Sequence, residues 1–391
     1  MSYKKMFPMF KNNKNIVYFD NSALTFKPKL VIKSINDFYT KYSVSTRTSD
    51  STLGIKMSNL ISQTKNNIGS LIDAKENEII FTSGTTESLN LIIRMLSKII
   101  FDGEILLSYY NHSSNIVPFI EIFKNSNIKI NYFSDMNSLL KLINNKTKII
   151  SLSQITNNFN VTYDLEIIYK LCKEKNIILI NDAAQVIAHQ KISLHNSDVI
   201  VFSGNKLYGP TGVGILCVKE DLLRKLEPQK WGGGQVQNID YNVWTAKNSL
   251  YKYEPGTLNF AGILGLNAAI NFIKLISYKK INQIENKLAN YLYDELSKLN
   301  NIVIESKRGD LILLFNVKNI PSQDVASYLG HKNVYVRSGI FCAHMITKNN
   351  NIKYKNSYIR ISISFYNTKR DVDILVKTLK KGGDFLEFLY K

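Results

Sequence analysis

The stretch Ser203-Gly-Asn-Lys-Leu-Tyr-Gly-Pro-Thr-Gly212 places one lysine, Lys206, in a polar turn between two apolar runs. Residues 198–202 read Asp-Val-Ile-Val-Phe, and residues 213–218 read Val-Gly-Ile-Leu-Cys-Val. This pattern predicts a buried strand, a turn, a Gly/Pro loop and a second strand. An amine at the end of a buried strand can reach into a site and form an imine. Taken alone, Lys206 is more simply explained as a solvated turn lysine, so the interpretation depends on other residues.

The composition is that of an ordinary globular protein. The 391 residues are 45% hydrophobic and 21% charged, which leaves room for one large domain and a smaller one. No apolar run approaches the length that spans a bilayer, and the first ten residues, interrupted by Pro8, do not resemble a signal peptide. We therefore predict a cytoplasmic protein without a membrane partner.

The formal net charge of +19 raises the possibility of nucleic-acid binding. However, the lysines are scattered singly, and their densest pairs are only Lys4-Lys5, Lys279-Lys280 and Lys380-Lys381. This distribution indicates biased residue usage more than a binding surface, so we predict no nucleic-acid partner. A basic, non-catalytic scaffold that binds RNA or a protein partner is the remote alternative.

The three cysteines are too few and too widely spaced for a disulfide framework or a metal site. We expect Cys172, on a helical period, and Cys217, inside an apolar strand, to be small core residues. Cys342 differs, because it lies in a predicted loop between Arg337 and His344. A cation and an imidazole can favour a thiolate, although an ion-pair arginine and a loop histidine explain the same two residues equally well.

Strands and helices alternate along the first 218 residues, which predicts an α/β fold whose mostly parallel sheet is sandwiched by helices. In such sheets, ligand sites collect beyond the carboxyl ends of the strands. The expected strands are 16–19, 78–82, 104–108, 129–133, 148–152, 177–180, 198–202 and 213–218. The expected helices in this part are 29–42, 57–71, 83–100, 116–124 and 165–175, with a short helix at Leu139.

The pattern changes after Trp231-Gly-Gly-Gly234. Residues 235–253 are polar and aromatic without clear periodicity, and we interpret them as a long functional loop. Two long helices and a set of short strands follow, which predicts a smaller α+β domain. We expect the large cofactor-binding domain to comprise residues 16–275, and the small domain to comprise residues 1–15 and 276–391.

Several candidate functional residues stand at predicted strand ends. Ser83-Gly-Thr-Thr86 offers backbone amides, hydroxyls and a helix N-terminus to a phosphate, although the same residues are common helix caps. Asp182 can hold a proton on a ring nitrogen or be a routine turn carboxylate. His112 can stack on a flat cofactor or be a surface histidine. Together with Lys206, this set matches the needs of pyridoxal phosphate.

The ordered motifs resemble the class-V aminotransferase family, and within it the SufS-type cysteine desulfurases, over residues 18–379. Each motif is weak alone, whereas the ordered set is highly specific. The motifs are Ser83-Gly-Thr-Thr-Glu87, His112 with Asn115-Ile-Val-Pro118, Asp182-Ala-Ala-Gln185, Phe202-Ser-Gly-Asn-Lys-Leu-Tyr-Gly-Pro-Thr-Gly212, Trp231-Gly-Gly-Gly234, Glu254-Pro-Gly-Thr257, Val336-Arg-Ser-Gly339 with Cys342, and Arg360 with Tyr366-Asn-Thr368.

The resemblance implies a pyridoxal 5'-phosphate enzyme in which Lys206 is the catalytic Schiff-base lysine. Asp182 would pair with the pyridine nitrogen, Gln185 would bond the phenolate oxygen, and His112 would stack on the ring as a catalytic and cofactor-binding residue. The implied phosphate ligands are Thr85, Thr86 and Ser203, with Thr257 from the partner subunit of a homodimer. Asn205 is a further cofactor-binding residue, and Arg360 with Asn157 would bind the substrate carboxylate.

The implied activity converts L-cysteine to L-alanine and leaves a persulfide on the catalytic Cys342. The sulfur would pass to a SufU- or SufE-like protein acceptor for iron–sulfur cluster assembly or another sulfur-transfer pathway. A selenocysteine lyase, a cysteine sulfinate desulfinase or another enzyme of the same family is the alternative. Cys342 would be dispensable in that case.

The chain departs from the resembling enzymes at four places, one of which is the loop of residues 45–52, which lacks the histidines expected there. Asn205 stands where they usually carry a histidine before the lysine, and Asn111 stands where they often carry an acid before the stacking histidine. Ile340-Phe341 replaces a histidine pair before the cysteine. These changes concern phosphate affinity and proton transfer and leave the core set intact.

Overall fold

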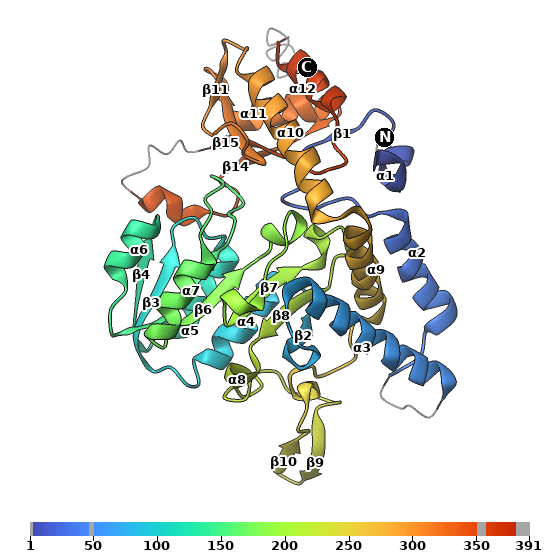
Figure 1. Ribbon diagram of the computed structural model, residues 1–391, viewed down its shortest axis with the longest axis vertical. Helices are drawn as coiled ribbons and strands as arrows, with labels where there is room; N and C mark the ends of the chain where they lie inside the picture. Colours follow the sequence, from blue (N-terminus) through green and yellow to red (C-terminus); the bar gives the residue numbers. More distant parts are fainter. Residues whose placement is uncertain (1–2, 47–50, 350–356, 381–391) are drawn as a thin grey trace.

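Seven strands form the sheet that carries the candidate site (Figure 1). The computed structural model describes residues 3–46, 51–349 and 357–380. The strand order is β2-β8-β7-β6-β5-β3-β4, and β8 alone in this sheet runs antiparallel to its neighbours. The strands are β2 (Ile79–Thr82), β3 (Asp102–Ser108), β4 (Asn127–Phe133), β5 (Thr147–Ser153), β6 (Ile178–Asp182), β7 (Val199–Ser203) and β8 (Gly214–Val218).

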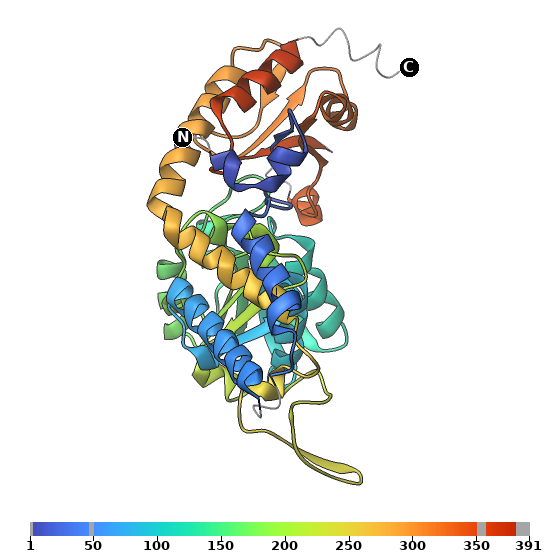
Figure 2. The same cartoon turned by 90° about the vertical axis from the view of Figure 1, so that its right-hand side faces the viewer.

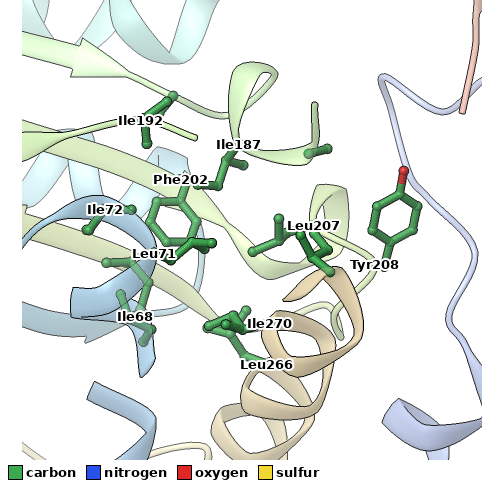
Figure 3. Close-up of a cluster of buried hydrophobic side chains, with 14 of the residues drawn as sticks. Ile68, Leu71, Ile72, Ile187, Ile192, Phe202, Leu207, Tyr208, Leu266 and Ile270 are labelled. Atoms are coloured by element: carbon green, nitrogen blue, oxygen red, sulfur yellow. The ribbon is translucent and has the colours of Figure 1, made fainter. Parts of the chain in front are cut away.

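Both faces of this sheet are apolar, which explains the nearly continuous hydrophobic runs. In β7, Val199 and Val201 pack on one face, whereas Ile200 and Phe202 pack on the other. Figure 3 shows the cluster that contains Phe202, to which α3 (Thr52–Ile72) contributes Leu71 and α9 (Phe260–Ile276) contributes Ile270. The predicted mostly parallel sheet between helices is confirmed. The first face is covered by α4 (Thr85–Leu96) and α5 (Val117–Phe123), and the second by α3 (Thr52–Ile72), α6 (Met136–Leu142), α7 (Leu165–Glu174) and α9 (Phe260–Ile276).

A second, antiparallel sheet of order β11-β12-β15-β14 forms the core of the upper part of the molecule in Figure 1. Helix α10 runs from the lower part into this upper part (Figure 2). The elements are β11 (Ile302–Ile304), β12 (Ile312–Val317), β14 (Arg337–Gly339), β15 (Tyr358–Ser362), α10 (Tyr278–Leu296), α11 (Ser322–His331) and α12 (Lys369–Lys380). A further strand pair is β1 (Val17–Tyr18) with β13 (Val334–Tyr335), and further α-helices are α1 (Pro8–Asn12), α2 (Lys29–Asp37) and α8 (Glu220–Leu223).

The division into residues 16–275 and residues 1–15 with 276–391 stays a prediction. Residues 1–2, 350–356 and 381–391 of the expected small domain lie outside the described residues. The N-terminal segment contacts both expected domains. Phe7 packs against Tyr208 and Phe272 of the larger one and against Phe365 and Tyr366 of the smaller one.

The interpretation of residues 235–253 as a loop is wrong. Strands β9 (Val236–Asp240) and β10 (Val243–Ala246) form an antiparallel hairpin that projects from the body (Figure 1). The polar run within β9 has no apolar alternation because both faces of the hairpin are largely exposed. Tyr241 at its tip is 98% exposed. The sequence pattern that marks half-buried strands is therefore missing here.

Within the described part of the chain, no single helix is long and apolar enough to cross a membrane. Helices α9 and α10 reach that length and composition only as a pair, and they meet at a bend of 75°.

An ion pair between His189 and Glu285 links the loop after β6 to α10. The Glu285 side chain is fully buried and the His189 side chain is 15% exposed. His189 Nδ1 lies 2.8 Å from Glu285 Oε2, and Asn282 donates a 2.7 Å hydrogen bond to the His189 carbonyl. Burial disfavours the charged imidazole, but the carboxylate of Glu285 outweighs burial, and the pKa of His189 is raised. Protonated His189 therefore adds its full contribution to the free energy of unfolding below the unfolded-state pKa of about 6.5. This contribution is lost as the pH rises through the raised pKa of the folded state.

We expect Glu285→Gln to lower the free energy of unfolding by about 1–3 kcal/mol near pH 6, with a smaller difference at higher pH. Urea unfolding of the full chain between about pH 6 and pH 9 measures this slope. The control is His195→Gln, which removes an exposed histidine. Equal pH dependence in wild type and Glu285→Gln would show that the pair does not titrate as described.

Candidate active site

A cavity of about 480 Å³ opens beyond the carboxyl ends of the parallel strands and below β14 and β15. It brings together residues that lie more than 270 positions apart in the chain, from Thr85 to Arg360. Thr257 is exposed and lies outside this cavity, so within one chain it does not join the other predicted site residues. The predicted residues that line the cavity are Thr85, Thr86, His112, Asn157, Asp182, Gln185, Ser203, Asn205, Lys206, Cys342 and Arg360.

Lys206 and Asp182 occupy the ends of neighbouring strands. Asp182 ends β6, and Lys206 lies in the tight turn that follows β7. The turn is closed by hydrogen bonds from the Leu207 and Gly209 amides to the Gly204 carbonyl. Burial lowers the pKa of Lys206 and raises the pKa of Asp182, and each group's charge partly opposes the shift of the other. A lowered pKa favours the neutral, nucleophilic form of the amine.

The start of α4 forms the predicted anion cradle. The Thr85 hydroxyl is buried without a hydrogen-bond partner in the described structure, and the Thr86 hydroxyl lies 2.8 Å from the Ser114 hydroxyl. The side of Gly84 where a Cβ would project is open, with no atom within 4 Å. A Cβ on Gly214 would lie 2.4 Å from the Gly84 Cα, so glycine is required where β8 passes the cradle. An unsatisfied hydroxyl beside a helix N-terminus suits a phosphate.

His112 presents a neutral ring to the cavity. Its Nδ1 accepts a 3.1 Å hydrogen bond from the Ser114 amide, which places the proton of the neutral ring on Nε2. Burial lowers the pKa of His112 to about 4, and the positive charges of Lys206 and Arg360 act in the same direction. An uncharged, flat imidazole is suited to stacking on an aromatic cofactor.

Arg360 is 2% exposed and is held by two partners. Its Nη2 donates to Asp20 Oδ1 at 2.8 Å, and its Nη1 donates to the Asn157 carbonyl at 2.9 Å. Its Nε is buried and has no hydrogen-bond partner within the described residues. Burial lowers the pKa of Arg360, with Asp20 acting in the opposite direction. A buried guanidinium with a free donor fits a carboxylate ligand.

Asp20 is the residue that the sequence interpretation missed. It also accepts hydrogen bonds from Arg337, whose Nη2 lies 2.7 Å from Oδ2, so one carboxylate joins both arginines. The polar cluster Asp20-Asn21-Ser22 directly after a predicted strand was the available signal. The role of Arg337 as an ion-pair residue is thus visible, while its effect on the Cys342 thiol stays a prediction.

Cys342 is exposed at the edge of the cavity, whereas Cys172 and Cys217 are buried. Burial raises the pKa of the Cys172 thiol to about 12 and that of Cys217 well above its ordinary value. These two thiols are therefore inert core groups, as expected from the sequence. The main-chain oxygen of Cys342 accepts two 2.7 Å hydrogen bonds, from the amide and the hydroxyl of Ser113.

Comparison with known proteins assigns the fold. The sequence model described as "Aminotransferase class-V" matches residues 17–375. The chain belongs to the class-V aminotransferase family. A curated relative in this family, a protein of Ureaplasma parvum named as a probable cysteine desulfurase, is 38% identical, with 97% of this chain and 96% of the relative covered. A protein of Borreliella burgdorferi with the same name is 36% identical, with 97% and 95% covered.

Solved structures agree with this family membership. The apo structure of a cysteine desulfurase from Thermococcus onnurineus superposes with a TM-score of 0.91 at 26% identity, covering 97% of this chain and 98% of that one. The cysteine desulfurase CsdA from Escherichia coli, in an S-sulfonic acid form, gives a TM-score of 0.89 at 26% identity, covering 99% and 98%. The similarity therefore spans the seven-stranded sheet and the smaller antiparallel sheet alike.

Pyridoxal phosphate is the cofactor of this member of the class-V aminotransferase family, and the cavity fits it. The unsatisfied Thr85 hydroxyl at the helix N-terminus suits the phosphate, and the Asp182 carboxylate suits a protonated ring nitrogen. The neutral His112 ring and the Lys206 amine complete the donor set. Which of the predicted residues hold which cofactor atom stays a prediction.

We expect Arg360→Lys to raise the KM for cysteine by about 10- to 100-fold and to lower kcat less, because an ammonium cannot keep the contacts to Asp20 and the Asn157 carbonyl and also donate to a substrate carboxylate. Steady-state kinetics separates the two parameters. The control is Arg308→Lys, because Arg308 pairs with Asp294 through two nitrogens at an exposed position. An unchanged KM in a folded Arg360→Lys protein would contradict carboxylate binding at this residue.

Proposed function

We propose that this chain is a pyridoxal-phosphate-dependent cysteine desulfurase that converts L-cysteine to L-alanine and carries the sulfur as a persulfide on Cys342. The observation that carries the proposal is the presence of an exposed thiol in the same cavity as a half-buried lysine, a buried aspartate and a buried arginine. Relatives of 38% and 36% identity named as probable cysteine desulfurases support it.

Each cavity residue has a separate role in this proposal, which follows from its position. Arg360 binds the substrate carboxylate through its free Nε, and this contact orients the substrate amine and thiol within the cavity. Lys206, with a pKa lowered by burial, takes the proton from the substrate Cα and returns a proton later. Bound pyridoxal phosphate supplies the electron sink that stabilises negative charge at that carbon. Asp182 keeps a proton on the ring nitrogen.

Cys342 accepts the sulfur. Its thiolate attacks the substrate Sγ, so that an S–S bond forms while the Cβ–Sγ bond breaks and Cβ gains a proton. One cysteine and one protein thiol thus give one alanine and one persulfide, and the atoms balance without an external oxidant. The exposure of Cys342 leaves the persulfide accessible to an acceptor.

The direct test is release of alanine and sulfide from L-cysteine by the purified holoprotein in the presence of a reducing acceptor. Alanine and sulfide in equal amounts support the proposal. Release of alanine from selenocysteine or cysteine sulfinate, with no turnover of cysteine, would favour the alternative enzymes of the same family. A protein without the absorption band of bound pyridoxal phosphate would favour the non-catalytic scaffold.

We also infer a homodimer, because Thr257 is exposed and lies outside the cavity of its own chain. In a dimer, Thr257 reaches the phosphate held by the other subunit. The apolar side chains exposed on the β9–β10 hairpin, Ile239 and Val243, are consistent with burial against a second copy. Sedimentation equilibrium measures the state. The SufU- or SufE-like acceptor, the iron–sulfur pathway and the cytoplasmic location stay predictions.

A further inference from the structure

The turn that carries Cys342 has an unfavourable backbone conformation. The Ala343 amide donates a 3.0 Å hydrogen bond to the Ile340 carbonyl, which closes a four-residue turn. The two central residues, Phe341 and Cys342, have φ values of 55° and 57°. Positive φ at both central positions is normal for asparagine and glycine and is disfavoured for a bulky side chain. Contacts outside the turn must therefore hold it in place.

Two such contacts act on the main chain. Asn157 Nδ2 donates a 2.8 Å hydrogen bond to the Phe341 carbonyl, and Ser113 donates twice to the Cys342 carbonyl. These bonds orient two peptide groups, but they leave the side chains of the turn unrestrained. The restraint on the side chains has to come from packing.

The Phe341 side chain provides that packing. The guanidinium carbon of Arg360 lies 4.9 Å from the centre of the Phe341 ring. The buried ring also packs against Ile312, Leu314 and Tyr358 of the smaller sheet. A guanidinium over an aromatic face is an attractive contact that strengthens when it is shielded from water. Because Asp20 and Asn157 fix Arg360, the ring rests on a rigid partner.

We propose that Phe341 is a positioning residue that anchors the Cys342 turn to the carboxylate-binding Arg360. The inference rests on the proposed function, in which Arg360 holds the substrate and Cys342 takes its sulfur. One ring then sets the position of the thiol relative to the substrate. The Phe341 ring carries no titratable proton, so this side chain acts by packing and not by proton transfer.

The test replaces the ring while keeping an apolar side chain of similar volume, with Phe341→Leu and Phe341→Met. We expect main-chain amides of residues 340–349 to exchange hydrogen for deuterium about fivefold faster or more in the full chain without substrate. We also expect kcat to fall by about fivefold or more with a smaller change in KM, because Arg360 keeps its contacts to Asp20 and Asn157.

Two further variants separate the ring contact from general loss of packing. Phe341→Tyr keeps the aromatic face and should restore exchange and kcat to within about twofold of wild type. Phe315→Leu makes the same chemical change at a buried ring of β12 that packs with Leu313 and Ile359 in a different hydrophobic cluster from Phe341. This variant should leave the exchange of residues 340–349 unchanged.

Wild-type exchange and kcat in both Phe341→Leu and Phe341→Met would overturn the proposal, and either variant suffices if the other does not fold. Equal impairment in Phe341→Tyr would also overturn it. The exchange measurement needs no turnover. Absence of desulfurase activity in wild type would therefore reject the proposed function, while faster exchange in Phe341→Leu would still support the anchor.

Discussion

Replacing Lys206 with alanine is expected to lower cysteine turnover by about a thousandfold or more, because the proposed function makes this residue both the covalent attachment point and the proton carrier. Desolvation lowers the pKa of this half-buried amine, and Asp182 is a neighbouring carboxylate, which matches a nucleophile that works near neutral pH. The visible absorption band of the bound cofactor should shift or disappear in the same variant.

The matched control is Lys191→Ala, which removes an exposed lysine paired with Asp73. It should leave both turnover and the absorption band unchanged. A folded Lys206→Ala protein that keeps the band and the turnover of wild type would remove the basis for the catalytic assignment of Lys206.

The second large effect is expected for Cys342→Ala. Because the proposed function has the thiolate of Cys342 form the new S–S bond, its loss should lower sulfur transfer from cysteine by about a hundredfold or more. The absorption band of the bound cofactor should stay, since no phosphate or ring contact is assigned to this thiol. Assays of alanine and sulfide with a reducing acceptor provide the measurement.

Cys217→Ala is the control for Cys342→Ala, because it removes a buried thiol within β8. We expect reduced stability and unchanged cofactor-bound turnover per folded molecule. Full activity of Cys342→Ala on cysteine would exclude the persulfide route. It would favour the selenocysteine or cysteine sulfinate alternatives, for which this cysteine is dispensable.

Sequence patterns predicted the sheet well because its strands are buried on both faces. Runs such as Ile177-Ile-Leu-Ile180 are too apolar for any exposed element, and the polar residue after a run that forms a parallel strand marks the edge where the site lies. Asp182 and Lys206 were found in this way. The hairpin β9–β10 was missed because its side chains are mostly exposed, and exposure removes the alternation that identifies a strand.

The contacts between distant residues could not be predicted from one sequence. Asp20 joins Arg337 and Arg360 only because the N-terminal segment returns to the smaller sheet, where Asp20 pairs with Ser362 in a parallel bridge. The Phe341 ring meets Arg360 through the pairing of β12 and β15 and the turn that follows β14. The polar cluster Asp20-Asn21-Ser22 marks Asp20 as a candidate but does not identify its two arginine partners, and no local pattern pairs Phe341 with Arg360.

The most direct test of the central claim is the mass of the peptide that contains Cys342 after the holoprotein has been incubated with L-cysteine without a reductant. The proposed function predicts that this peptide gains the mass of one sulfur atom, that a reductant removes it, and that peptides with Cys172 and Cys217 stay unmodified. Production of alanine with no added sulfur on the Cys342 peptide would contradict the account.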